Sequence, residues 1–479
     1  MIRYDYGPSS SQEMGESVHE ARDGGYLVGA DVFWREGGPS AGLIRLDAYG
    51  NIRWQKSYSR TGEDPFASLE ETSGGGYFLA TSGLEDVTYS PYTEDWALSI
   101  QKLDMDGNVT WQSVYGTSSD GPFRATVLET HDGGYLLAGG ERGRSFFIKL
   151  DAERHVQWEK RYGQAWIATL PADDGGYVAL LTDTPPGRRT LAKLDAYANV
   201  EWVKTYDMRV DLRSMQKTRD GGFILAGFVA VDCLSCVDAL DWQADLSVLK
   251  VDSRGEIQWQ RAYGGLRFDA ATKVLQTSDG GYVVLGYTDS SYIEVNGDGE
   301  VWLMKLDGNG NIQWQRTYGR QSTSDIRYEE KPFSIQQTAD GGYIVAGLAC
   351  AQGSAAPYGC DVLVLRLDSE GSIPGCPLMG SGPLGTDVTN ITSASGTLEP
   401  LPSLWFKSLD SSPARISETN ATANVECSYT PPFGIKMTMP ETIVFVCIVI
   451  LAAITSIVVI KRIGRRWSSA HKMNNAGNI

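Results

Sequence analysis

The chain has 479 residues, of which 42% are hydrophobic and 10% aromatic, an ordinary composition for a globular protein with a large core. Its formal net charge of −17 argues against nucleic acid as a partner and suits a soluble domain outside the cell.

A repeated phrase organises the chain up to about residue 376. Each of seven units carries a Gly-Gly-aromatic step, followed after a variable gap by a basic residue, an aliphatic residue and Asp. The aromatic residues are Tyr26, Tyr77, Tyr135, Tyr177, Phe223, Tyr282 and Tyr343, and the aspartates are Asp47, Asp104, Asp151, Asp195, Asp252, Asp307 and Asp368. A repeat of about 42 to 61 residues is typical of radial or stacked arrays.

Each unit predicts four short antiparallel strands, which we name A to D in chain order. In the sixth unit, residues 271–277 alternate weakly, a Ser-Asp-Gly-Gly hairpin signal follows, and residues 282–286 and 301–306 are β-branched and aromatic runs. Residues 312–316 alternate apolar and polar side chains with a period of two. Seven such units predict an all-β, seven-bladed β-propeller.

The outer strand of each blade has a fixed register. In six units a Trp stands seven residues after the repeat Asp, and a Tyr follows four residues later. A one-residue slip would move every side chain to the other face of the sheet, so the spacing indicates that this Trp packs against a neighbouring blade. The tryptophans are Trp54, Trp111, Trp158, Trp202, Trp259 and Trp314.

The first residues are predicted to close the ring. Tyr6-Gly7 matches the Tyr-Gly that ends strand D elsewhere, which aligns Ile2 with the repeat Trp. The seventh unit lacks its own strand D because Pro374 cannot donate to a strand ladder. We therefore expect residues 2–6 to supply the outer strand of blade seven; the alternative is a fragment with further blades upstream.

Beyond the repeats the composition changes. We divide the chain into a propeller at 1–379, a Ser/Thr/Pro-rich spacer at 380–440, a transmembrane helix at 441–460 and a basic cytoplasmic tail at 461–479. Residues 443–460 are an uncharged apolar run of 18, and Lys461, Arg462, Arg465 and Arg466 follow. The positive-inside rule then places the tail in the cytoplasm and the propeller outside, in a single-pass cell-membrane protein.

Other features agree with an extracellular propeller, and one does not. Glycosylation acceptors occur at Asn108, Asn390 and Asn420, and six cysteines precede the apolar run. No signal peptide precedes the first strand. Either translation starts upstream or the protein is tail-anchored with a cytosolic propeller; the basic flank favours the first.

The predicted disulfides follow chain order. They join Cys233 to Cys236, Cys350 to Cys360 and Cys376 to Cys427, while Cys447 lies within the apolar run. The closely spaced pair at 233 and 236 also fits a redox pair or half of a zinc site.

Loop lengths point to one face for ligand binding. The A–B and C–D turns stay short, whereas the interval containing the B–C loop varies from 16 residues in unit three to 29 in unit five. B–C and D–A loops emerge on the same face of a propeller, and binding residues are usually built on such loops. The candidates are Phe33, Trp34, Tyr89, Tyr92, Trp242, Tyr287, Tyr292, Arg320, Arg327 and Tyr328. Exposed aromatic residues among polar groups suit a protein or glycan ligand, although each could instead pack within its own loop.

A calcium site is a weaker alternative. Asp104, Asp106 and Asn108 space their oxygens around a glycine turn, as do Asp307, Asn309 and Asn311. Other units place non-ligands at the second position, so turn chemistry explains the pattern without metal. The set Asn296, Asp298 and Glu300 keeps a calcium interpretation open because it lies in an insertion.

Catalytic patterns are scarce. None of the four histidines, His19, His131, His155 and His471, forms a metal or Ser/Cys pair by spacing. The carboxylates are too numerous to single out a glycosidase pair.

The unit Asp-Gly-Gly-Tyr … Lys-Leu-Asp-x-x-Gly-Asn-Ile-x-Trp-Gln-x-x-Tyr-Gly resembles the repeats of quinoprotein-like propellers on bacterial and archaeal cell surfaces. The resemblance covers residues 1 to about 376 and implies a propeller fold and a surface location. The Asp…Gly…Trp segment also resembles the tryptophan-docking motif of quinoprotein dehydrogenases. Its Trp stands seven residues after Asp rather than eight, and no cofactor-pocket motif accompanies it.

The sequence therefore predicts a membrane-anchored extracellular propeller that binds a protein or glycan through its loop face, without a cofactor. The alternative is a polysaccharide-acting glycoside hydrolase or lyase with its site in the central channel on the same face. Two carboxylates in a cleft would favour the enzyme, and a shallow aromatic surface would favour binding.

Overall fold

The computed structural model describes residues 2–5, 13–34, 38–59, 65–85, 95–118, 124–141, 143–183, 188–206, 210–230, 244–265, 267–289, 299–319, 326–353, 356–373, 393–395, 408–409, 415–418 and 422–425. The chain divides into two compact units, residues 1–427 and 428–479, and all described residues belong to the first.

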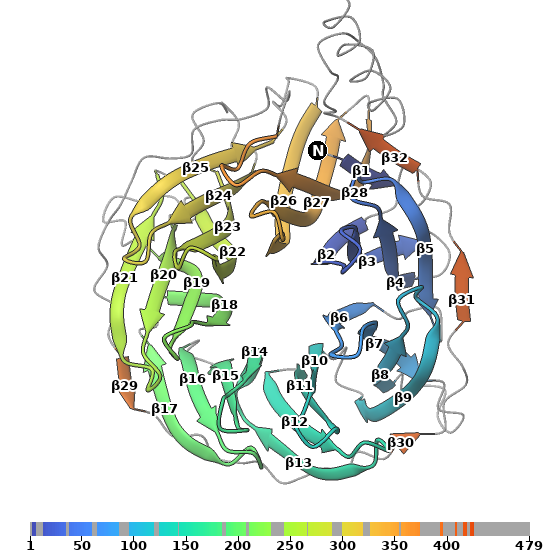
Figure 1. The fold of residues 1–479 in the computed structure, drawn as a ribbon, viewed down its shortest axis with the longest axis vertical. Helices are drawn as coiled ribbons and strands as arrows, with labels where there is room; N and C mark the ends of the chain where they lie inside the picture. The colour runs from blue at the N-terminus through green and yellow to red at the C-terminus, as the bar shows by residue number, and fades with distance from the viewer. Residues whose placement is uncertain are drawn as a thin grey trace, which may run out of the picture. The chain divides into compact units, whose positions relative to one another are not determined.

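The first unit is a ring of seven antiparallel sheets, with no helix among the described residues (Figure 1). Blade 1 contains β2 (Glu13–Glu20), β3 (Tyr26–Trp34), β4 (Gly38–Leu46) and β5 (Ile52–Ser59). Blade 2 contains β6 (Phe66–Glu71), β7 (Tyr77–Glu85), β8 (Asp95–Leu103) and β9 (Val109–Ser118). Blade 3 contains β10 (Arg124–Glu129), β11 (Tyr135–Glu141), β12 (Arg144–Leu150) and β13 (Val156–Tyr162).

The remaining blades repeat this order. Blade 4 contains β14 (Ala165–Pro171), β15 (Tyr177–Thr182), β16 (Arg189–Leu194) and β17 (Val200–Tyr206). Blade 5 contains β18 (Val210–Lys217), β19 (Phe223–Ala230), β20 (Ala244–Val251) and β21 (Ile257–Tyr263). Blade 6 contains β22 (Asp269–Gln276), β23 (Tyr282–Thr288), β24 (Glu300–Leu306) and β25 (Ile312–Tyr318). Blade 7 contains β26 (Ile326–Gln337), β27 (Tyr343–Gly353) and β28 (Ala356–Leu367).

The predicted ring closure is confirmed, but its predicted register is wrong by two residues. Strand β1 (Ile2–Asp5) pairs antiparallel with β28 and supplies the missing strand D of blade 7. Tyr4 pairs with Val362, as Tyr318 pairs with the equivalent Val301 in blade 6. Tyr4, not Tyr6, thus holds the position of the repeat Tyr. A shift of two keeps each residue on the same face of the sheet, so the strand pattern alone does not distinguish the two registers.

Four short strands from the region predicted as a spacer add to the outside of the ring (Figure 1). They are β29 (Ser393–Ser395), β30 (Ser408–Leu409), β31 (Arg415–Glu418) and β32 (Thr422–Val425). They pair with the outer strands of blades 4, 2, 1 and 7, in that order. Because the blades themselves follow one another from 1 to 7, these strands are added in the reverse sense around the ring.

The repeat Tyr and Trp link each blade to the next. In six blades the Tyr hydroxyl donates a hydrogen bond to a backbone carbonyl in the C–D turn of the following blade. The pairs are Tyr58 to Gly107, Tyr115 to Arg154, Tyr162 to Ala198, Tyr206 to Gly255, Tyr263 to Gly310 and Tyr318 to Gly371. A Cβ on Gly107 would lie 2.6 Å from the Trp54 ring, so glycine lets the turn approach the neighbouring Trp. The fixed spacing of Asp, Trp and Tyr in the repeat therefore reflects contacts between neighbouring blades.

The basic residue of the repeat is buried against the A–B turn of its own blade. In blade 5, the Lys250 ammonium lies 2.8 Å from a carboxylate oxygen of Asp220 and also donates to the Val251 carbonyl and the Gln258 side chain. Burial raises the pKa of Asp220, but Lys250 and the Gly222 amide outweigh it and lower that pKa to about 2. Blade 2 has Gly74 where the other blades have this Asp.

The Cys350–Cys360 disulfide is confirmed and joins directly paired residues of β27 and β28. The other four cysteines of the predicted pairs, Cys233, Cys236, Cys376 and Cys427, lie outside the described residues, as does the apolar run at 443–460. No helix in the described part of the chain is both long and apolar enough to span a bilayer.

Candidate functional site

A β-bulge interrupts the innermost strand of six blades. The pairing between strands A and B shifts by one residue at Glu16, Ala67, Ile167, Arg213, Thr272 and Phe333. In blade 3 the same pairing runs without a shift. A bulge leaves one residue outside the ladder and redirects its side chain, which is why bulges often lie beside functional sites.

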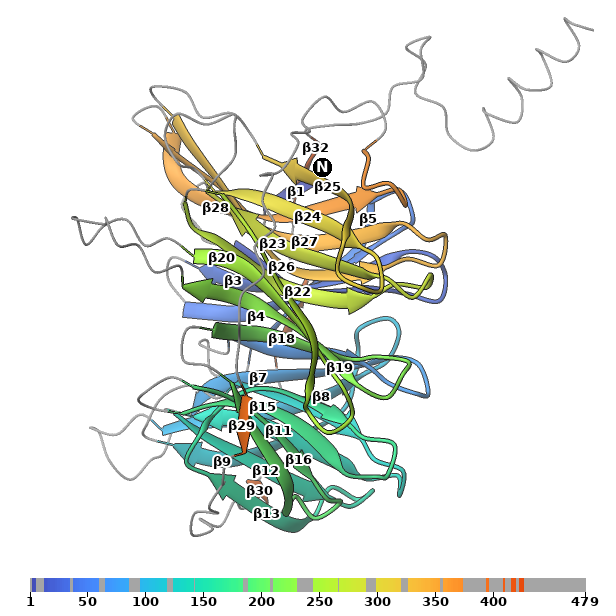
Figure 2. The same cartoon turned by 90° about the vertical axis from the view of Figure 1, so that its left-hand side faces the viewer.

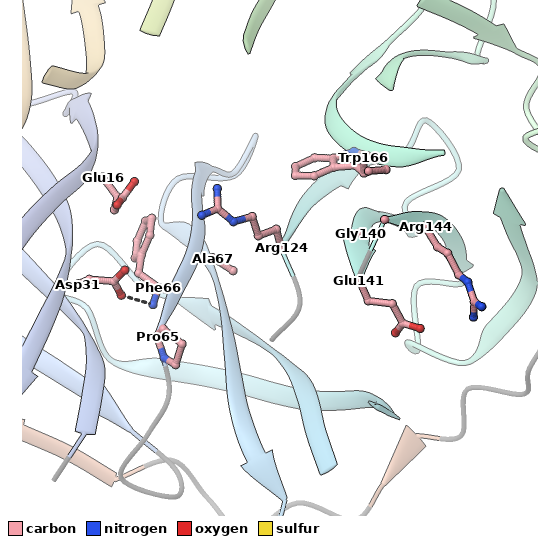
Figure 3. Close-up of a pocket in the computed structure, with 12 residues that line it drawn as sticks. Glu16, Asp31, Pro65, Phe66, Ala67, Arg124, Gly140, Glu141, Arg144 and Trp166 are labelled. Carbon is pink, nitrogen blue, oxygen red and sulfur yellow. Dashed lines mark hydrogen bonds between the residues drawn. The ribbon is translucent and has the colours of Figure 1, made fainter. Parts of the chain in front are cut away.

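Two of these bulge residues, Glu16 and Ala67, line a pocket of about 380 Å³ that we call the inner pocket (Figure 3). Its lining comprises Glu16, Asp31, Pro65, Phe66, Ala67, Arg124, Gly140, Glu141, Gly143, Arg144, Ala165 and Trp166. These residues come from the A strands of blades 1 to 4, the far ends of the B strands of blades 1 and 3, and the B–C turn and start of strand C in blade 3. The pocket therefore lies on the face that carries the B–C and D–A loops, opposite the tight turns (Figure 2).

Two aromatic rings form part of the pocket wall. A Cβ on Gly29 would lie 2.5 Å from the Phe66 ring, so the phenyl group occupies the space that this glycine leaves. Gly140 similarly leaves room for Trp166, whose backbone and Cβ approach within 3.0 to 3.3 Å of the position of a Cβ there. The Trp166 indole N–H donates to the Thr169 hydroxyl at 2.9 Å, which fixes the ring orientation.

Asp31 is a buried acid in this wall. Its carboxylate accepts a hydrogen bond of 2.6 Å from the Phe66 amide, drawn as a dashed line in Figure 3. Burial raises the pKa of Asp31 to about 7, with a further increase from the Glu16 charge, against the opposing effects of the Phe66 amide and Arg124. A group with this pKa exchanges a proton near neutral pH.

Glu16 lies on the same side of the pocket and extends a charged cluster along the inner strands. Burial raises its pKa, while Arg124 and Lys273 oppose that increase. Glu70, which accepts a 3.0 Å hydrogen bond from the Thr126 hydroxyl, also has a raised pKa because it is buried. Acids with raised pKa values thus cluster along the inner strands of blades 1 and 2.

Glu141 presents an oxygen with no hydrogen-bond partner among the described residues. The Arg161 guanidinium lies 3.2 Å from its Oε1, but its Oε2 is buried and unpartnered, and the residue is only 8% exposed. A buried acceptor without a donor is costly, and a water molecule enclosed in the wall is the usual donor to such a group.

The structure places only part of the predicted binding set. Phe33 and Trp34 end strand β3, but their side chains lie outside the described residues. Tyr89, Tyr92, Trp242, Tyr292 and Arg320 also lie outside them.

The remaining predicted residues lie away from the inner pocket. Tyr287 stacks on Phe268 at 5.7 Å, and Phe268 in turn contacts Phe228, over which the Arg213 guanidinium lies. Arg327 and Tyr328 belong to strand β26 of blade 7.

The predicted calcium candidates in the C–D turns have their oxygens engaged. In the Asp307 turn, one carboxylate oxygen accepts from the amides of Asn309 and Asn311 and the other accepts from the Asn311 side chain. Asn296 and Asp298 lie outside the described residues, and Glu300 is buried at the start of β24. Within the described ranges no group of three or more Asp, Glu, His or Cys is arranged to hold a metal.

The predicted glycosylation site at Asn108 occupies such a turn. Its side-chain nitrogen donates to Asp104 and its oxygen accepts from Lys56. Asn390 and Asn420 lie outside the described residues.

The inner pocket escaped prediction because its residues belong to strands rather than loops. Glu16, Asp31, Phe66, Arg124 and Trp166 are all strand residues. One signal was available: charged residues within strands A of blades 1 to 3, where a buried inner strand would carry apolar residues.

A second pocket, of about 710 Å³, lies on the opposite face between blades 3 and 4. Its wall includes Trp158, Tyr177 and Tyr197, with His131 and the ion-paired Asp132 and Lys149. Most of these groups belong to the repeat: Asp132 and Lys149 pair within blade 3, and Trp158 packs in the same cluster as Tyr177 of blade 4.

Comparison with known proteins finds no family for the chain and only distant structural similarity. No protein-family model matches the chain, and no curated protein matches its sequence. Among solved structures, streptogramin B lyase is 11% identical with a TM-score of 0.41, covering 76% of this chain and 98% of that one. The Dos1 propeller is 11% identical with a TM-score of 0.42, covering 74% and 84%. The xylan β-1,4-xylosidase of Bacillus halodurans C-125 is 11% identical with a TM-score of 0.31, covering 82% and 97%.

Proposed function

We propose that this β-propeller binds a glycan in the inner pocket of its loop face. The observation that carries the proposal is the lining of that pocket, which places Phe66 and Trp166 beside Asp31, Arg124 and Glu141. Sugars present apolar C–H faces that pack on aromatic rings, and hydroxyls that bond to charged side chains, so one pocket needs both kinds of group.

The size and polarity of the inner pocket support the same ligand class. Its volume of about 380 Å³ falls in the range of small-molecule sites, and so suits one or two sugar units of a longer chain. The guanidinium groups of Arg124 and Arg144 line the pocket and would donate hydrogen bonds to sugar hydroxyls.

We further propose that the propeller is held at the outer surface of the cell membrane. The support is the apolar run at 443–460 with its basic flank, the acceptor asparagines and the resemblance of the repeat to surface-exposed propellers. A glycan ligand suits such a location, where polysaccharides are abundant. Protease protection of intact cells, with a tag after residue 479, tests this orientation; a protected propeller would contradict it.

A glycan array with the full-length chain tests the ligand. Arg144→Ala and Trp166→Ala should each weaken binding by at least about tenfold, because each removes a group from the pocket wall. Tyr49→Ala is the matched control, since Tyr49 is a 70% exposed aromatic residue in a turn of the opposite face. Thermal unfolding of each variant separates loss of binding from loss of fold.

A Trp34→Ala variant distinguishes the inner pocket from the loops around it. Loss of binding in this variant together with full binding by Trp166→Ala and Arg144→Ala would move the site to the B–C loop of blade 1. Absence of glycan binding by the unmodified chain would contradict the proposed function.

A further inference from the structure

We propose that Asp31 and Glu16 are a catalytic acid and base that hydrolyse a glycosidic bond of a polysaccharide held in the inner pocket. This inference rests on the proposed glycan-binding function and adds a reaction to it.

The two carboxyl groups reach the pocket from neighbouring strands of one blade. Asp31 lies in β3 opposite Met14 of β2, and Glu16 follows two residues later as the unpaired residue of the bulge. Without the bulge, the alternation of β2 would place a different side chain at this position. Figure 3 shows both carboxyl groups beside the Phe66 ring, at one end of the pocket.

Asp31 and Glu16 differ in their hydrogen bonds and in the charges around them. Asp31 is 8% exposed and fixed by the Phe66 amide, so a proton on its other oxygen faces a defined direction. Burial also raises the pKa of Glu16, but two cations, Arg124 and Lys273, oppose that rise and favour its ionised form. Burial raises the pKa of Asp31 to about 7, so that a large fraction of Asp31 is protonated at neutral pH. Two carboxyl groups in unequal environments can take different roles in one reaction.

The reaction follows from these roles. Asp31 gives its proton to the bridging oxygen while the bond from that oxygen to the anomeric carbon breaks. A water molecule forms the new bond to that carbon and gives a proton to Glu16. Glu16 then releases its proton to solvent and Asp31 takes one up, which restores the starting state. The net change is the addition of one water across one glycosidic bond.

Phe66 and Arg124 lie beside the two acids, where one would contact the sugar and the other affects the pKa values of both carboxyl groups. The Phe66 ring adjoins the two acids and would carry the sugar on one side of the scissile bond. The Arg124 charge acts on both carboxyl groups and restrains the rise of their pKa values. Trp166 and Glu141, from blades 4 and 3, would bind the sugar on the other side.

The test measures reducing ends released from soluble xylan, arabinan, β-glucan and polygalacturonate by the full-length chain. Asp31→Asn and Glu16→Gln should each lower kcat/KM by at least about 100-fold, mainly through kcat. Binding of the same polysaccharide should stay within about threefold, because both replacements keep shape and polarity. Asp106→Asn, an exposed carboxylate on the turn face, is the matched control and should keep full activity.

The pH profile gives a second readout that a structural role would not produce. Activity should fall above about pH 7 as Asp31 loses its proton, and fall again in acid as Glu16 gains one. Full activity of Asp31→Asn would overturn the proposal, as would a product with a new carbon–carbon double bond, which marks elimination rather than hydrolysis. A chain that binds these polysaccharides but releases no reducing ends would overturn the reaction and leave glycan binding standing. A chain that binds none would overturn both.

Discussion

The aspartates of the A–B turns and the two acids of the inner pocket have pKa values shifted in opposite directions. On the turn face, the Asp220 and Asp279 carboxylates face buried lysines and backbone amides, and the pKa of each is lowered to about 2. On the loop face, Asp31 and Glu16 are enclosed and form no ion pair with another described residue, and their pKa values are raised. On the turn face, each ion pair ties the A–B turn to strand C of its own blade. On the loop face, the two acids have the raised pKa values that the proposed reaction needs.

The largest expected effect concerns packing between blades on the turn side. Trp314 packs against Tyr343 of the next blade, with ring centroids 6.0 Å apart, and against Gly371. Trp314→Ala should lower the free energy of unfolding by about 3 kcal/mol, measured by urea titration. Tyr49→Ala should change it by less than about 0.5 kcal/mol. Equal losses in both variants would show that the repeat Trp does not link the blades.

Removing an ion pair of the turn face should have the next largest effect. Asp220→Asn leaves Lys250, whose side chain is 4% exposed, without its anionic partner, at a cost of about 2 kcal/mol at pH 7. The folded-state pKa of Asp220 lies below the unfolded value of 3.8, so its stabilisation is present above about pH 4 and lost towards pH 2. Urea titrations of both chains should therefore converge at about pH 2. A difference that persists there would contradict the ion-pair account.

The stability that Asp31 contributes on the loop face should depend on pH in the opposite direction. The pKa of Asp31 is raised from 3.8 to about 7, so its contribution to stability is fully present below about pH 4 and lost as the pH rises through 7. Asp31→Asn keeps the acceptor for the Phe66 amide and removes this loss. Relative to the unmodified chain, the variant should become progressively more stable as the pH rises from 4 to 8, because over this range Asp31 ionises more readily in the unfolded chain than in the folded one. A gain of the same size at both pH values would refute the assignment.

The smallest expected effect comes from adding an A–B turn aspartate to blade 2, which lacks one. A Cβ on Gly74 of blade 2 meets no atom within 4 Å, and the Lys102 ammonium lies over the Phe78 ring rather than beside an Asp. Gly74→Asp should restore the acceptor and raise the unfolding free energy by about 0.5 kcal/mol. The same change at an exposed variable position of a C–D turn, Ser253→Asp, is the control and should have no effect.

The features of the fold that recur in every repeat could be predicted from the sequence. The seven sheets, the closing strand and the contact of the repeat Trp with the next blade all follow from positions such as Asp307, Trp314 and Tyr318. The closing register did not follow, because a shift of two residues conserves the face and Tyr6-Gly7 offered a matching dipeptide. The fifth strands at 393–425 lie in Ser-, Thr- and Pro-rich sequence without alternation, so no period revealed them.

The inner pocket lies on the face for which loop lengths predict ligand binding, and that binding stays a prediction. None of the pocket's lining residues was among the predicted binding residues, because Glu16 and Arg124 stand in strands rather than in loops. A bulge adds one residue to a strand and shifts its alternation, and nothing in a single unit shows where the added residue lies. Asp31 depends on Phe66 of the next blade for its hydrogen bond, a contact that sequence separation conceals.

The reversed order of the fifth strands has a mechanical consequence. Tension applied at the C-terminal end of the first unit reaches β32 on blade 7 first, and then β31, β30 and β29 on blades 1, 2 and 4. Each of these strands has four residues or fewer, so each would peel at low force while the seven underlying sheets remain intact. Optical-tweezer extension from that end should show these small steps before any blade opens, so that the outer strands would yield before the ring itself bears load.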